Sequence, residues 1–149
     1  MIYRQFVEYV KKESAATVEH LVFDLGKHLI LLNGEGDKGM VVQVENVAIS
    51  NPMIRKTTWQ LKILPLILKC QAQRIALVVV GPMQLGEESE VEAESGQLAV
   101  LATIADAERT ERWLGVVQQD DEMNLSVEWQ EPVLDASIPD FWILEEALR

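Results

Sequence analysis

Residues 75–80 read IALVVV, an unbroken run of apolar and mostly β-branched side chains. A strand with one face in water alternates apolar and polar residues, whereas a continuous apolar run is typical of a strand that is covered on both faces. The run therefore predicts the central strand of a sheet.

Toward the C-terminus, three short runs follow that are apolar or alternate in polarity, separated by polar turns: 98–104, 113–117 and 125–129. Consecutive short strands usually pair with one another, so these runs and 75–80 predict a four-stranded antiparallel meander. Beyond it, Ser137 or Asp140 is expected to cap a short final helix that contains Trp142 and Leu148.

Toward the N-terminus, Ser50-Asn51-Pro52 predicts the start of a helix. A polar residue can cap it, and a proline in the first turn loses no hydrogen bond, because the amides there have no partner within the helix. This helix would run to about Ala72. Pro65 interrupts it, so either the helix is kinked there or a second helix begins. Between Trp59 and Leu68 the helix is apolar on most faces, which predicts a central buried helix.

Before it, the segment from Ile2 to Leu25 has apolar residues at the helical period, which predicts one long helix or two short ones. Gly26 is a plausible end, although continuation to Leu32 stays open. Residues 28–33 and 40–47 then predict two strands of a hairpin, because the stretch from Gly34 to Gly39 between them is rich in turn residues.

These elements predict the α+β class for a single domain that spans 1–149. The expected architecture is an N-terminal helical segment, a hairpin, a central apolar helix, a four-stranded meander and a short C-terminal helix, arranged in two layers.

The charges are distributed very unevenly along the 149 residues. The chain holds 13 Lys and Arg against 24 Asp and Glu, a formal net charge of −11. No acid lies between Glu45 and Glu87, whereas residues 77–149 are strongly acidic. Such a net charge repels phosphodiester backbones, so nucleic acid is not expected as a partner. The charged start of the chain and the lack of a long apolar stretch predict a cytoplasmic protein without a membrane span.

Two groups of residues are candidate binding sites. His20, Asp24 and His28 are four apart and would share one face of a continuous helix, where two imidazoles and a carboxylate could hold a divalent metal. Arg55, Lys62 and Lys69 are seven apart and would form a basic stripe. That stripe would bind a small anionic ligand, the protein's own acidic half or that of a second subunit.

Other motifs favour structural roles. Gly34, Gly36 and Gly39 spell G-x-G-x-x-G, but the residues that follow read as a strand, which favours a hairpin loop over a dinucleotide site. Cys70, the single thiol, is expected to be packed and inert. Trp129 and Trp142 lie near polar, proline-bordered segments and are expected at an interface.

No complete catalytic motif is found, and no cofactor is predicted. The leading expectation is therefore a non-catalytic module for protein interaction or assembly, as a homodimer or bound to a basic protein. The alternatives are a metal-dependent hydrolase that uses His20, Asp24 and His28, and a binder of a small anion at the basic stripe.

Overall fold

A computed structural model describes residues 2–23, 26–34, 39–82, 98–134 and 138–149 of the chain. Side chains are described within these ranges except those of residues 19–23, 82 and 134. Asp24 and Ser137, which the sequence analysis singled out, lie outside the described residues.

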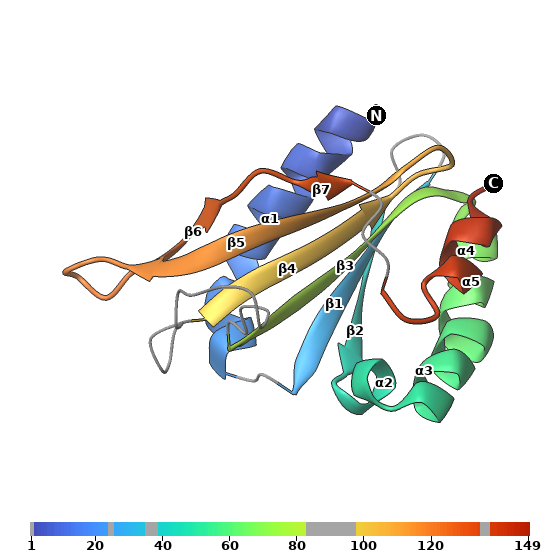
Figure 1. Cartoon of the computed structure of the whole chain (residues 1–149), viewed down its shortest axis with the longest axis horizontal. Helices are drawn as coiled ribbons and strands as arrows, with labels where there is room; N and C mark the ends of the chain where they lie inside the picture. The colour runs from blue at the N-terminus through green and yellow to red at the C-terminus, as the bar shows by residue number, and fades with distance from the viewer. Residues whose placement is uncertain (1, 24–25, 35–38, 83–97, 135–137) are drawn as a thin grey trace.

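The core of the molecule is an antiparallel sheet in the order β2-β1-β3-β4-β5-β6, and a short strand β7 pairs with β5 (Figure 1). The strands are β1 (Lys27–Gly34), β2 (Gly39–Glu45), β3 (Ala72–Pro82), β4 (Leu98–Ala105), β5 (Thr110–Gln119), β6 (Leu125–Trp129) and β7 (Val133–Leu134). The α+β class, the hairpin of β1 with β2 and the meander from β3 to β6 are confirmed. The strand that contains residues 75–80 is central, because β1 and β4 flank it.

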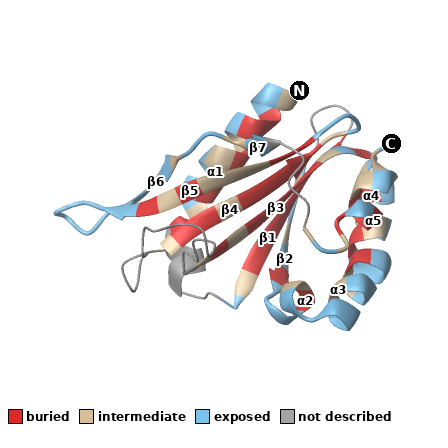
Figure 2. Ribbon diagram, in the orientation of Figure 1, coloured by how far each residue is buried: buried red, intermediate tan, exposed pale blue. Residues whose placement is uncertain are grey.

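Helices cover both faces of the sheet. On one face, α1 (Tyr3–Phe23) packs through Phe6, Val10 and Val18 onto β1, β3 and β4. On the other, a helical segment and the C-terminal helix α5 (Trp142–Ala147) bury Trp59, Phe141 and Leu144. Figure 2 shows the buried residues running along the strands between these helices. The predicted two layers are therefore wrong: there are three, because the central strand is apolar on both faces.

The side chains of β3 alternate between these two cores. Ala76, Val78 and Val80 face α1, while Ile75 and Leu77 face the helical segment. All five are at most 3% exposed. Each face of this strand therefore needs its own apolar cover, and burying a side chain of this size contributes roughly 1.5–3 kcal/mol relative to leaving it in water.

The helical segment consists of α3 (Pro52–Thr58), the π-helical turn η2 (Trp59–Ile63) and α4 (Leu64–Cys70) in unbroken succession. Asn51 caps it as predicted, since its side chain accepts hydrogen bonds from the amides of Met53 at 3.0 Å and Ile54 at 3.1 Å. Pro65 has no amide to continue an α-helical ladder. The π turn directly before it and a new α-helix with proline in its first turn accommodate this loss without a break.

The short elements complete the connections. Helix α1 is one long helix whose described part ends at Phe23, and continuation to Leu32 is wrong because β1 begins at Lys27. A single turn of helix, α2 (Val47–Ser50), joins β2 to the helical segment. The C-terminal helix is confirmed, but Asp140 does not cap it: Phe141 is at the N-cap position, and no side chain of the described residues makes a capping hydrogen bond there.

Gly34, at the end of β1, is required by close packing. A Cβ atom at this position would collide with the backbone carbonyl of Cys70, whereas one at Gly81 in β3 would meet nothing within 4 Å. We therefore expect Gly34→Ala to lower the free energy of unfolding by about 1–3 kcal/mol, because the end of α4 has to move. Gly81→Ala is the matched control and should change it by less than about 0.5 kcal/mol. Denaturant unfolding measures both, and equal stability of the two variants would contradict the packing described.

Candidate functional site

Arg55, the first residue of the predicted basic stripe, binds a carboxylate in the acidic C-terminal half of the same chain. Its Nε and Nη2 atoms donate to Oδ2 of Asp140 at 2.9 Å and 2.8 Å, and its Nη1 donates to the carbonyl oxygen of Ile49 at 2.7 Å. Both side chains of the ion pair are mostly buried, at 11% and 13% exposure. The pair fastens the start of α5 to α3, so this guanidinium is occupied within the fold.

The other two cations of the stripe have different surroundings. The Nζ atom of Lys62 lies 3.4 Å from the carbonyl oxygen of Gln43 in β2, which forms one edge of the sheet. Lys69 is exposed on α4. The structure therefore does not gather Arg55, Lys62 and Lys69 around one ligand. A lysine beside an edge strand also discourages pairing with a foreign strand.

The metal-binding hypothesis loses the helical geometry that suggested it. His28 lies in β1, so it does not share a helix with His20, whose backbone belongs to α1. Asp24 and the side chain of His20 are outside the described part of the structure. Within that part, no group of three His, Cys, Asp or Glu side chains is placed to hold a metal ion. A site built from these residues in another way stays a prediction.

His28 has a structural partner. The ring is buried, and its Nε2 atom lies 2.9 Å from Oδ1 of Asn46. This contact joins the start of β1 to the turn that leads into α2. Its Nδ1 atom is buried without a hydrogen-bond partner among the described residues.

The two tryptophans expected at an interface differ in exposure. Trp129 is half-buried against the core beneath α1, with the Nζ atom of Lys11 5.9 Å from its ring centre. Trp142 is 56% exposed at the start of α5. Their role in an interface stays a prediction.

Cys70 is a free, half-buried thiol whose Sγ atom lies 3.9 Å from the carbonyl oxygen of Ile67.

The surface that sequence reasoning missed lies on the outside of the helical segment. We call the outer helical face the set Met53, Ile54, Leu61 and Leu68. Met53, Leu61 and Leu68 are 80%, 74% and 72% exposed, and Ile54 is 40% exposed. Met53, Ile54 and Leu61 line a shallow groove of about 400 Å³ together with Thr57, Thr58 and Lys62.

The predicted burial of this helix is thus only half right. Trp59, Ile63 and Ile67 point into the core and are at most 2% exposed, whereas Leu61 and Leu68 face solvent. The signal was present in the sequence, because a helix that is apolar on most faces has more apolar surface than one core can cover.

Comparison with protein-family models, with curated proteins and with solved structures finds no match to this chain. None of the described helices combines the length and the hydropathy needed to cross a membrane.

Removal of the Arg55 side chain should destabilise the fold. In Arg55→Ala, the mostly buried carboxylate of Asp140 and the carbonyl of Ile49 lose their guanidinium partner, so we expect the free energy of unfolding to fall by about 3 kcal/mol. Lys69→Ala removes an exposed cation and should change it by less than about 0.5 kcal/mol. Chemical denaturation of both variants is the measurement. A loss in Arg55→Ala no larger than that in Lys69→Ala would show that the ion pair does not hold α5.

Proposed function

We propose that this protein is a non-catalytic interaction module that associates with a second copy of itself through the outer helical face. The observation that carries the proposal is the exposure of Met53, Leu61 and Leu68, each above 70%, along one helical segment. Scattered exposed apolar residues are ordinary, but Met53, Ile54 and Leu61 line one groove, and a contiguous apolar patch is typical of a protein interaction site.

These side chains contribute nothing to the core of their own chain. The inward positions of the segment already fill the space above the sheet with Trp59, Ile63 and Ile67. The outward leucines therefore stay in water, and covering one completely would contribute roughly 1.5–3 kcal/mol. No described residue covers these side chains, so that gain is available to a partner.

The surroundings of the face select an acidic partner. Residues 46–86 contain no Asp or Glu. Lys56, Lys62 and Lys69 are exposed along the same segment, although Nζ of Lys56 lies 4.0 Å from Oδ1 of Asp140 and Nζ of Lys62 lies 3.4 Å from the carbonyl oxygen of Gln43. Positive side chains around an apolar centre favour a partner surface with an apolar residue among carboxylates, because complementary charge steers association.

The chain itself carries such a surface at the turn between β5 and β6. Asp121 and Glu122 are exposed there, and the neighbouring Met123 is 71% exposed. Oδ1 of Asp120 accepts hydrogen bonds from the amides of Glu122 at 2.9 Å and Asn124 at 2.8 Å, which orders the turn. An ordered turn loses little conformational entropy when it docks.

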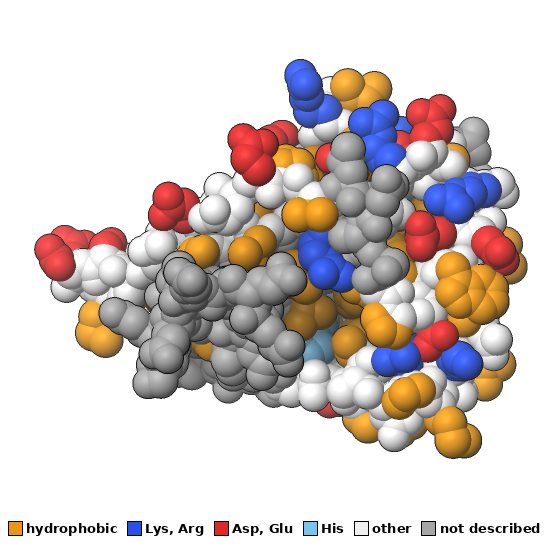
Figure 3. All heavy atoms as spheres, viewed as in Figure 1, with side chains coloured by type: hydrophobic (Ala, Val, Ile, Leu, Met, Phe, Trp, Pro, Cys, Tyr) orange, Lys and Arg blue, Asp and Glu red, His pale blue; other side chains and the backbone are white. Residues whose placement is uncertain are grey.

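The two surfaces lie at opposite ends of the molecule. Figure 1 shows the β5–β6 hairpin projecting from one end of the sheet and the helical segment at the other. Figure 3 shows acidic side chains gathered at the hairpin tip, and hydrophobic side chains beside Lys and Arg at the opposite end. The two therefore cannot meet within one chain, and an antiparallel pair of chains would use both contacts twice and close a symmetric dimer.

A cytoplasmic location forms part of the same proposal. Cys70 is a free thiol, and unpaired cysteines are usual where the medium is reducing. The proposed partner, a second copy, would then be present in the same compartment.

Sedimentation velocity over a concentration series tests the proposal. The unaltered chain should pass from monomer to dimer, with association weakening as salt rises from low to physiological ionic strength. Leu61→Glu should raise the dissociation constant about tenfold or more, because it places an unpaired carboxylate at the centre of the apolar contact.

Val133→Glu is the matched control, since it adds the same charge at a side chain that is 59% exposed on β7, outside the outer helical face. It should leave the dissociation constant within about twofold. A chain that stays monomeric at every concentration, or a Leu61→Glu variant that dimerises as well as the control, would overturn the proposal.

A further inference from the structure

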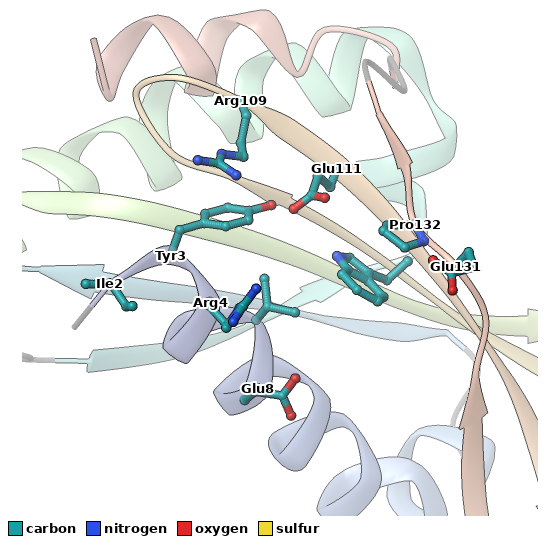
Figure 4. Close-up of a pocket in the computed structure, with 10 residues that line it drawn as sticks. Ile2, Tyr3, Arg4, Glu8, Arg109, Glu111, Glu131 and Pro132 are labelled. Carbon is teal, nitrogen blue, oxygen red and sulfur yellow. The ribbon is translucent and has the colours of Figure 1, made fainter.

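A separate cavity of about 680 Å³ opens between the first turns of α1 and strand β5, away from the outer helical face (Figure 4). Tyr3, Arg4, Val7 and Glu8 line it from α1. Glu111 and Trp113 of β5 lie opposite, and Ile2, Arg109, Glu131 and Pro132 complete the lining. The volume is that of a small-molecule site.

The inner end of this cavity carries a buried negative charge. Glu111 is only 9% exposed, whereas Arg4, Glu8, Arg109 and Glu131 are exposed around it. Among the described residues, no ion pair to Glu111 is found within 4.0 Å. Removing a carboxylate from water without pairing it with a cation costs desolvation free energy. This position therefore favours a positively charged ligand.

Tyr3 organises this carboxylate. Figure 4 shows its hydroxyl pointing toward the carboxylate of Glu111. Burial raises the pKa of Tyr3, and the hydrogen bond and negative charge of Glu111 raise it further. The phenol therefore stays protonated, and its single proton is shared between Glu111 and the carbonyl oxygen of Ile104, which lies 3.4 Å from the hydroxyl. One such bond leaves most of the acceptor capacity of a carboxylate free, since its two oxygens offer about four lone-pair sites.

Two aromatic rings, those of Tyr3 and Trp113, form part of the walls, and each already lies beside a cation of the chain. The guanidinium carbon of Arg109 lies 4.7 Å from the ring centre of Tyr3, and Nζ of Lys11 lies 3.8 Å from that of Trp113. Both rings thus already attract cations from the chain. The indole Nε1 of Trp113 is buried and has no hydrogen-bond partner among the described residues, so its N–H is a local reporter of what enters the cavity.

We propose that this cavity binds a small organic cation, an amidinium, guanidinium or primary ammonium group on an apolar body, with Glu111 as its counter-charge. The ligand's apolar part would lie against Val7 and the two aromatic rings. An anion alone is disfavoured, because the buried carboxylate repels it even though Arg4 and Arg109 stand at the rim. The proposal is independent of self-association, since none of these residues belongs to the outer helical face.

The test uses two probes of nearly the same shape, benzamidine, which is a cation, and benzamide, which is neutral. NMR titration of the full chain gives the dissociation constant of each. We expect benzamidine to bind at least about tenfold more tightly than benzamide, because only the cation can pair with Glu111. The indole N–H signal of Trp113 should shift during the benzamidine titration.

Glu111→Gln removes the charge and keeps the side-chain size and an acceptor for Tyr3. The affinity ratio of the two probes should fall close to one in this variant, whereas Glu146→Gln, an exposed change on α5, should leave the ratio unchanged. The ratio is measured within one protein, so a partly unfolded sample does not imitate the effect. If Glu111→Gln fails to fold, the Trp113 signal of the unaltered chain decides.

Three results would overturn the proposal. These are the absence of saturable benzamidine binding at millimolar concentration, a Trp113 indole signal that does not respond to it, and a Glu111→Gln variant that keeps the preference for the cation.

Discussion

Both faces of β3 have to be kept from water, and the rest of the fold follows from this constraint. Because Ala76, Val78 and Val80 point one way while Ile75 and Leu77 point the other, a single layer of helices cannot cover the strand. Helix α1 covers the first face. The helical segment, fastened to α5 by Arg55 and Asp140, covers the second. Strands β1 and β4 protect the backbone of β3 on its two sides.

The same constraint explains the exposed patch. To fill the second core, the helical segment needs large side chains at the inward positions that Trp59, Ile63 and Ile67 occupy. Nothing in the core requires Leu61 or Leu68, yet both are apolar and lie outside. Contact of these side chains with water is unfavourable unless a partner covers them. The packing of the chain's own core therefore does not explain why these exposed positions are apolar.

Local signals in the sequence predicted much of the fold. Asn51-Pro52 marked a helix start, the glycine-rich stretch after Asn33 marked a hairpin, and the run 75–80 marked the central strand, because each depends on neighbours in the chain. The third layer was missed, since it depends on which face each helix finally covers. The local sequence predicts Asp140 as a helix cap, but its carboxylate pairs with Arg55, which lies 85 residues away in the chain. The cavity beside Glu111 likewise lies between α1 and β5, which are far apart in the sequence, so no short motif could predict it.

We propose that the outer helical face and the β5–β6 turn are two halves of one contact between copies. A dilution series of backbone amide NMR spectra tests this most directly, because each residue reports separately. We predict that signals of Leu61, Leu68, Glu122 and Met123 move together with concentration while those of α1 stay fixed. Spectra that do not change on dilution, or changes confined to residues outside these two surfaces, would contradict the account.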